Sequence, residues 1–571
     1  MFQQYKPPVK TRSGLLLLTI FVLLGNLSCA RGNDPHSPAG SLPASPAVFT
    51  QKDPYTRPVA ASSAVLTQRG DNARSGWNEH ETVLNTSTVN VARFGKRVLY
   101  PVDGKIYAQP LFVPNLVIRG ITYNVVVVAT EHDSVYAFDA DARTTEAPLW
   151  HTSFLHNGIT AVSSTRDVRC QSISPEFGIT GTPVIDPTSR TLYVVAATHE
   201  GAELVYRLHA LDITTGSEKL ASTHIRASVP GTGDDATAGK VIFNPRLEQM
   251  HMGLLLLNGV VYTSFASYCD KYPFHGWILG YRTSDLQQVI VYNSTPNGWG
   301  GGIWESASGL TADEAGNIYY LSGNGSFDLN TGGLNAGNSL VKLRPENGTL
   351  KMMDYFTPFN QVCTLAHDID FGSGTPLLLP GQAGIIAIGK EGRIYVVNRN
   401  HLGGYQAVHE PCSRQQQPRT NIDHVLQELP PYTLPEGFWG SVGYWAAPTG
   451  EYIYTAGNVD HLKAWKIVKG KLEPTPVSQA PETLNYPGGI PVVSSNQSVP
   501  DTGIVWLLDQ ENGAVLRAYD ATNLAHELYS SRQNASRDGL QDYDNFNVPT
   551  IANGEVFVDT SGSLAIFGLV E

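Results

Sequence analysis

Short apolar runs separated by turn residues recur along most of the chain, and each run has the length of a β-strand. The first examples are Val125–Ala129 and Val135–Asp139, followed by Leu192–Val195 and Leu208–Asp212. In several copies the second run ends in a small residue, a variable residue and Asp, and a turn with Thr, Asn or Gly follows. Apolar runs of this length between turn signals predict strands. No segment has the spacing of a long amphipathic helix, so the pattern predicts an all-β fold.

The pair of strands repeats at irregular intervals of roughly 40 to 70 residues, which suits a repeat architecture with loop insertions. Later copies are Val260–Tyr262 with Trp277–Tyr281, Ile318–Tyr320 with Leu340–Leu343, Ile394–Asn398, Tyr452–Tyr454 with Lys463–Trp465, and Ile504–Trp506 with Arg517–Asp520. A four-stranded sheet has two apolar faces, and radial stacking of such sheets buries both faces. The repeat therefore predicts a β-propeller of four-stranded antiparallel blades.

The two ends of the repeat region each lack part of a blade. Near the C-terminus three strands are expected, at Asn547–Thr550, Gly554–Val558 and Ser563–Phe567. A lone strand near Lys96–Tyr100 precedes the first repeat. We expect this strand to join the C-terminal strands and close the ring. The count predicts eight blades, with seven as the alternative.

The first 64 residues differ from the rest of the chain. Three basic residues precede the apolar run Leu15–Leu24, which is too short to span a bilayer and predicts a secretory signal peptide over residues 1–30. Residues 31–64 are rich in Pro, Ser and Ala and predict a disordered linker. Residues 65–571 then form the propeller domain, and the chain is exported to a bacterial periplasm or secreted.

Two modes of processing remain open at the end of the signal. Small residues at Ser28 and Ala30 permit cleavage after Ala30. Cys29 alternatively resembles the acceptor cysteine of bacterial lipoproteins, although Asn26 is a poor fit where that motif prefers an aliphatic residue. Lipidation would anchor the protein to a membrane.

Charge and cysteine content limit the classes of function that the sequence allows. The net charge is −12, which argues against nucleic acid because phosphate binding needs a basic face. No C-x-x-C-H motif occurs, so no c-type haem is attached to this chain. Export permits disulfides. We predict one between Cys170 and Cys269, in loops of neighbouring blades, and a second between Cys363 and Cys412.

One motif resembles a known family in its fold. Ala137–Asp139 with Trp150, Ala210–Asp212 with Gly216, and Ala518–Asp520 resemble the tryptophan-docking motif of the eight-bladed pyrroloquinoline-quinone (PQQ) alcohol dehydrogenases. Only the first copy keeps its Trp. The resemblance covers most of residues 65 to 570 and indicates a fold rather than an activity.

A second resemblance to the same PQQ-like family lies between about residues 270 and 400 and concerns chemistry. The segments that carry it are Gly300–Trp304, Asn317–Gly325, Thr357–Pro358, Asp368–Asp370 and Lys390–Arg399. The order of these segments follows the family's order. His367 stands where the family has Trp, and the family's adjacent-cysteine disulfide is absent.

The resemblance implies a role for five residues. Trp304 would stack beneath PQQ, and Lys390 would contact the quinone oxygens. Asn324 would ligate Ca²⁺, with Asp270 near the position of a second ligand, and Asp368 would be the catalytic base. These residue types suit the chemistry, because aromatic faces hold planar groups, oxygen ligands suit Ca²⁺, and a carboxylate accepts a hydroxyl proton. We expect Trp304, Asn324, Asp368 and Lys390 to converge on one end of the central channel.

Two functions remain open. The ordered motif residues favour a PQQ- and Ca²⁺-dependent dehydrogenase that oxidises a small alcohol or sugar. The missing adjacent cysteines, and lipidation at Cys29 if that mode of processing holds, favour a non-catalytic scaffold that binds an envelope protein, as outer-membrane assembly propellers do.

Overall fold

The computed structural model of the chain describes residues 64–408, 422–510, 513–540 and 545–570. Apart from Ala64, the predicted signal peptide and linker lie outside this part. The described residues belong to one compact unit. β-strand is their main regular secondary structure, which confirms the all-β prediction. The short helices are η1 (Leu329–Thr331), α1 (Gln361–Ala366), η2 (Phe371–Ser373) and α2 (Ala535–Asp538). No helix in the described part is long and apolar enough to cross a membrane.

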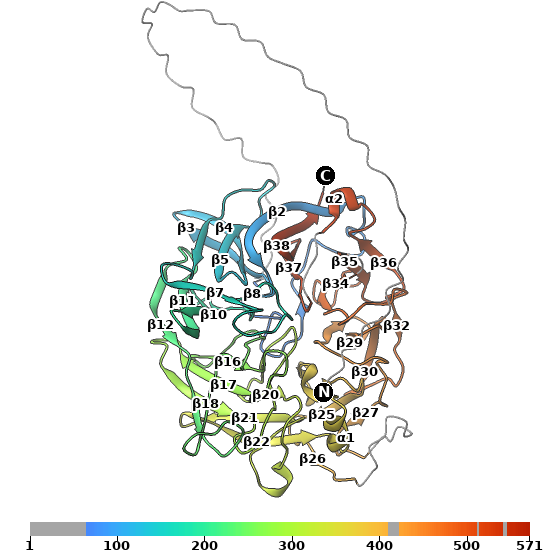
Figure 1. The fold of residues 1–571 in the computed structure, drawn as a ribbon. Helices are drawn as coiled ribbons and strands as arrows, with labels where there is room; N and C mark the ends of the chain where they lie inside the picture. Colours follow the sequence, from blue (N-terminus) through green and yellow to red (C-terminus); the bar gives the residue numbers. More distant parts are fainter. Residues whose placement is uncertain (1–63, 409–421, 511–512, 541–544, 571) are drawn as a thin grey trace, which may run out of the picture. The chain divides into compact units, whose positions relative to one another are not determined.

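Eight sheets of three or more strands, counted in the described residues, lie around a common centre (Figure 1). The first contains β3 (Leu111–Ile118), β4 (Ile121–Ala129), β5 (Ser134–Asp139) and β6 (Trp150–Ser153). The second contains β7 (Ile159–Ser163), β8 (Glu176–Phe177), β9 (Val184–Asp186), β10 (Thr191–Glu200), β11 (Glu203–Asp212) and β12 (Glu218–His224). The third contains β15 (Leu255–Leu257), β16 (Val260–Phe265), β17 (Trp277–Arg282) and β18 (Gln288–Asn293). The fourth contains β19 (Thr311–Ala312), β20 (Ile318–Leu321), β21 (Leu340–Glu346), β22 (Thr349–Thr357) and β26 (Gly404–Tyr405).

The remaining sheets continue in chain order. The fifth contains β23 (Leu377–Leu378), β24 (Gly384–Ile388), β25 (Ile394–Asn398) and β27 (Gln427–Glu428). The sixth contains β28 (Gly443–Ala447), β29 (Gly450–Ala456), β30 (Leu462–Val468), β31 (Lys471–Leu472) and β32 (Ser478–Gln479). The seventh contains β1 (Trp77–Asn78), β33 (Val492–Ser494), β34 (Ile504–Gln510), β35 (Ala514–Asp520) and β36 (Glu527–Ser530). The eighth contains β2 (Phe94–Lys105), β37 (Thr550–Ala552) and β38 (Glu555–Leu569), and a separate hairpin contains β13 (Ser228–Pro230) and β14 (Lys240–Ile242).

Most apolar runs in the sequence form strands where they were predicted. The C-terminus differs, because Asn547–Thr550 contributes only Thr550 to β37, and the two strands expected at Gly554–Val558 and Ser563–Phe567 form the single long strand β38. The pair predicted first becomes β4 and β5, which are antiparallel with Val127 opposite Ala137. The strand predicted near Lys96–Tyr100 is part of β2, and it pairs antiparallel with the C-terminal strand β38. Segments at the two ends of the described chain therefore share one sheet.

Trp150 shows how neighbouring sheets pack. Its indole N–H donates to the carbonyl of Ile213, at the end of β11, over 2.9 Å. Its ring covers Gly216 so closely that a Cβ there would lie 2.5 Å from the ring. Gly216 also has a φ of +72°, a conformation that favours glycine. The Trp of the first motif copy is thus docked on the turn of the second sheet.

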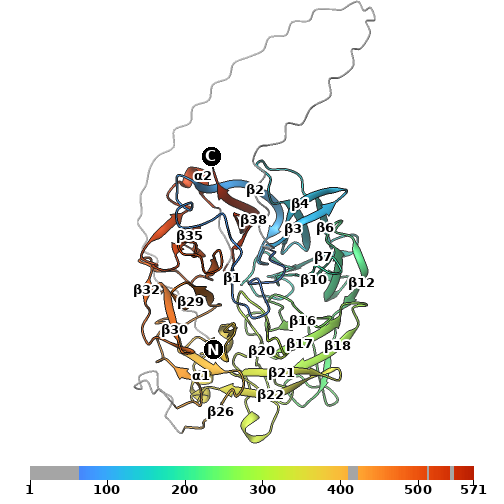
Figure 2. The ribbon, with the colours of Figure 1, turned by 180° about the vertical axis from the view of Figure 1, so that it is seen from behind.

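Residues 65–80, here called the inner strap, run along the innermost strands, and their short strand β1 lies near the centre in Figure 2. The strap hydrogen-bonds to one strand of each of the eight sheets. The pairs are Val65 with Phe112, Leu66 with Ile185, Asn72 with Leu256 and Ala312, Ala73 with Leu378, Ser75 with Tyr444, Gly76 with Val493, and Asn78 with Ile551. One short segment therefore connects strands that are hundreds of residues apart.

Two fully buried arginines fix the strap. Arg74 donates to the carbonyls of Leu310 and Leu254, over 3.1 and 3.2 Å. Arg69 donates to the carbonyls of Pro491 and Val442 on the other side. Burial lowers the pKa of Arg69 to about 9 and that of Arg74 to about 10. Their guanidinium groups satisfy carbonyls that the innermost strands would otherwise leave unpaired.

Candidate functional site

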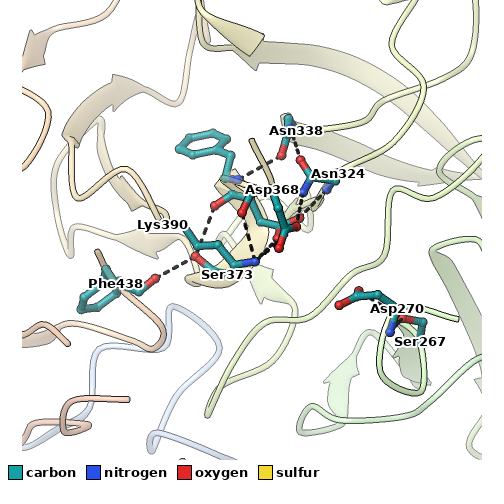
Figure 3. Close-up of polar contacts among 10 residues, drawn as sticks. Ser267, Asp270, Asn324, Asn338, Asp368, Ser373, Lys390 and Phe438 are labelled. Carbon is teal, nitrogen blue, oxygen red and sulfur yellow. Dashed lines mark hydrogen bonds and ion pairs between the residues drawn. The ribbon is translucent and has the colours of Figure 1, made fainter. Parts of the chain in front are cut away.

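Lys390 lies in the turn between β24 and β25, and its ammonium is held by two carboxylates (Figure 3). Nζ forms an ion pair with Asp370 and lies 3.6 Å from Oδ1 of Asp368. The Lys390 side chain is 20% exposed. Burial opposes its charge, but Asp370 and Asp368 outweigh that effect, and the pKa of Lys390 is raised. The lysine therefore stays protonated at neutral pH.

Asn324, just after β20, joins the same group. Its backbone N–H donates to Oδ1 of Asp370 over 2.6 Å, and its side-chain amide donates to Asp368 over 2.9 Å. Its Oδ1 accepts a hydrogen bond of 2.8 Å from Asn338, which in turn accepts the N–H of Phe371. We call Asn324, Asn338, Asp368, Asp370 and Lys390 the polar cluster.

The two carboxylates of the cluster differ in exposure. The Asp368 side chain is 77% exposed, whereas that of Asp370 is 12% exposed. Asp368 has a φ of +57°, an uncommon conformation for a non-glycine residue. Asp370 thus anchors the cluster from inside, and Asp368 is the carboxylate that a ligand can reach.

Trp304 lies beside the cluster, between β18 and β19. A Cβ on Gly323 would lie 2.8 Å from Asp370 and 3.2 Å from the Trp304 ring. His251 faces the same indole with a centroid distance of 6.5 Å. Burial lowers the pKa of His251 to about 4, so its imidazole is neutral at pH 7. Nδ1 of His251 has no hydrogen-bond partner among the described residues.

Asp270 lies apart from the cluster, next to Ser267 in the loop after β16 (Figure 3). Its neighbour Cys269 is disulfide-bonded to Cys170, as predicted, with a Cα–Cα distance of 5.6 Å. The pKa of Asp270 is raised to about 6, first by burial and then by the charge of Asp370. The other predicted pair involves Cys412, outside the described residues.

The structure thus brings Asn324, Asp368 and Lys390 into direct contact. Trp304 adjoins them across Gly323, and Asp270 interacts with them only through charge. Sequence reasoning gave no role to Asp370, although it is in the Asp368–Asp370 motif, and none to Asn338 or His251. A single histidine between two methionines carries no recognisable signal.

The site offers an aromatic face to a planar cofactor. The Trp304 indole is half-buried, and the absence of a Cβ on Gly302 and Gly323 lets the backbone pack closely against it. In contrast, the described residues contain no group of three His, Cys, Asp or Glu side chains that could hold a metal ion. Lys390 forms ion pairs with both Asp368 and Asp370, so these carboxylates do not form a Ca²⁺ site. The ligand roles of Asn324 and Asp270 stay predictions.

No family model and no curated protein matches the chain. Among solved structures it resembles the quinohemoprotein alcohol dehydrogenase of Comamonas testosteroni, with a TM-score of 0.56 and 13% identity over 89% of this chain and 80% of that one. It is similar to quinohemoprotein alcohol dehydrogenase ADHIIG of Pseudomonas putida HK5, with a TM-score of 0.56 and 12% identity over the same shares. A europium-containing methanol dehydrogenase has a TM-score of 0.57 and 13% identity, over 89% of this chain and 98% of that one. At these identities the likeness shows the fold alone, a β-propeller like that of quinoprotein alcohol dehydrogenases.

Proposed function

We propose that this protein is an exported, PQQ-dependent dehydrogenase that oxidises an alcohol or a sugar. The observation that carries the proposal is the polar cluster, in which Lys390 is held by Asp370 and Asp368 with Asn324 beside Trp304. We further propose that the eight sheets are eight blades, and that the pairing of β2 with β38 closes their ring.

Each residue of the site has a task in this proposal. Trp304 supports the planar cofactor by stacking, and Lys390 contacts its oxygens. When bound, PQQ supplies two-electron oxidising chemistry. Asp368 is exposed and accepts the substrate's hydroxyl proton. Asp370 positions Lys390 and the backbone of Asn324.

The testing experiment is reconstitution of the purified protein with PQQ, alone and with Ca²⁺ or Eu³⁺. The europium arm is included because one structural neighbour contains that ion. A changed quinone absorbance spectrum and dye-linked oxidation of alcohols or sugars are expected. Lys390→Ala is the matched control, and it should weaken PQQ binding. Absence of PQQ binding in all three arms would refute the proposal.

A second candidate is a scaffold at the bacterial envelope, free in the periplasm or anchored through Cys29. The absence of adjacent cysteines favours it. A protein that binds no PQQ but retains an envelope protein through cross-linking in cells would support this candidate.

A further inference from the structure

Two pairs of aromatic residues flank the polar cluster and have no role in the proposed function. The first aromatic pair is Tyr272 and Trp299, whose rings are 5.5 Å apart at an angle of 71°. The second aromatic pair is Trp439 and Tyr486, whose rings are 5.8 Å apart at 68°. Both tyrosines are 50% exposed. The pairs come from loops of different sheets, so no single element explains their placement.

The first aromatic pair is continuous with Trp304. Tyr272 packs on Phe274 with ring centroids 4.8 Å apart. The edge of Phe274 and the indole nitrogen of Trp304 both lie 3.2 Å from the position of a Cβ on Gly302. Aromatic surface therefore extends from the exposed Tyr272 to the half-buried Trp304.

The second aromatic pair lies next to Lys390. A Cβ on Gly437 would meet the Lys390 carbonyl at 2.5 Å and the Trp439 ring at 3.0 Å. Burial raises the pKa of Tyr486, and the charge of Lys390 opposes this rise. The loop of Trp439 is fixed to η2, because the Ser373 hydroxyl donates to the Phe438 carbonyl over 2.7 Å (Figure 3).

We propose that the two aromatic pairs and the polar cluster together form a carbohydrate-binding site, with the aromatic rings packing against the apolar faces of a sugar ring. Partly exposed Tyr and Trp side chains offer a large apolar surface with a polar tip. Asp368, Asn324 and Lys390 supply acceptors and donors for several hydroxyl groups of one ligand. The proposal deepens the proposed function, on which it rests for the location of the site, and selects sugars over simple alcohols.

The chemistry of the site argues against a small aliphatic alcohol. Such a molecule has one hydroxyl and would need an enclosed apolar surface to gain affinity. Here the reachable polar groups are several and charged, and the tyrosines are half exposed. A sugar has many hydroxyl groups and two apolar faces, so it can contact both the polar groups and the aromatic rings.

The test is binding by the protein without PQQ or metal. Saturation-transfer NMR and titration calorimetry would compare glucose, galactose, maltose and cellobiose with ethanol, 1-butanol and benzyl alcohol. At least one sugar should bind more tightly than every alcohol. Tyr272→Ala and Trp439→Ala should each weaken sugar binding by about threefold to tenfold, the range of aromatic contact energies.

Tyr123→Ala is the matched control, because Tyr123 lies in β4 of the first sheet and contributes to neither pair. It should leave sugar affinity unchanged. Tyr486→Ala serves as a second variant of the second pair if Trp439→Ala does not fold, as judged by its thermal transition. Binding of no sugar, tighter binding of an alcohol, or sugar affinity unchanged in the aromatic variants would each overturn the inference.

The outcome is separable from that of the proposed function. PQQ binding is measured by quinone absorbance, and sugar binding is measured in its absence. A protein that binds PQQ but no sugar retains the proposed function and loses this inference. A protein that binds sugar but no PQQ keeps the carbohydrate site and loses the dehydrogenase.

Discussion

Cys269 is bonded to Cys170, 99 positions earlier, and the bond fixes the loop on which Asp270 lies. Lys271, on the other side of Asp270, donates to the carbonyl of Val168 over 2.6 Å. The loop is thus attached to the second sheet's loop by a covalent bond and by a hydrogen bond.

Cys269→Ser should therefore lower the free energy of unfolding by about 2–4 kcal/mol, since a disulfide that closes a long loop restricts the unfolded chain. Urea denaturation of the wild type and the variant would measure the difference. The double variant Cys170→Ser with Cys269→Ser should be as stable as either single variant, because all three lack the same bond. Equal stability of wild type and Cys269→Ser would contradict the prediction.

A substitution of Arg74 tests how much the inner strap contributes to stability. Arg74→Met removes the donor to Leu254 and Leu310 and leaves buried carbonyls unpaired. We expect a loss of about 3 kcal/mol, the cost of leaving more than one buried acceptor unsatisfied. Urea denaturation would measure it. Arg226→Met is the control, since the Arg226 side chain is 72% exposed, and its effect should stay within about 0.5 kcal/mol. A similar effect for both variants would mean that the strap contributes little.

The strands could be predicted because their signal is local. Val125–Ala129 and Val135–Asp139 have the length and apolar character of strands, and a turn separates them. The inner strap gives no such signal. Its residues have no regular apolar pattern, and their hydrogen bonds go to strands far away in the sequence. Only the folded structure shows that Val65 and Asn78 both hydrogen-bond to strands of the surrounding sheets.

The sequence predicted most residues of the candidate site, but it did not predict which of them are buried. The motif supplies Asp368 and Asp370 two positions apart, and no sequence feature tells which one is buried. The positive φ of Asp368 turns the chain there, so that Asp370 meets Lys390 inside and Asp368 remains exposed. The aromatic pairs were also missed, because their members lie more than 20 residues apart and meet only through loops.

Because Asp368 is exposed and Asp370 is buried, their isosteric variants should have different effects. Asp368→Asn should leave PQQ affinity nearly unchanged and lower kcat by about 10²- to 10⁴-fold, the usual contribution of a general base. Asp370→Asn should instead weaken PQQ binding, because Asp370 holds Lys390 and the N–H of Asn324. Absorbance titration with PQQ and steady-state kinetics separate the two effects. Full activity of Asp368→Asn would remove it as the base.

His251 predicts a pH dependence of stability. Its pKa is about 4 in the folded protein, because burial disfavours the charged imidazole, against about 6.5 in an unfolded chain. Between these values the unfolded chain binds more protons, so the contribution of His251 to stability is lost as the pH falls from about 6.5 towards 4. His251→Phe lacks this proton uptake. Relative to the variant, the wild type should therefore lose about 2 kcal/mol of unfolding free energy between pH 7 and pH 4.5.

Urea denaturation at several pH values in this window would measure the difference. His156→Phe is the matched control, because His156 is exposed and the substitution removes the same imidazole. The His156 variant should follow the wild type at every pH. Parallel pH curves for wild type and His251→Phe would mean that the imidazole beside Trp304 is open to water.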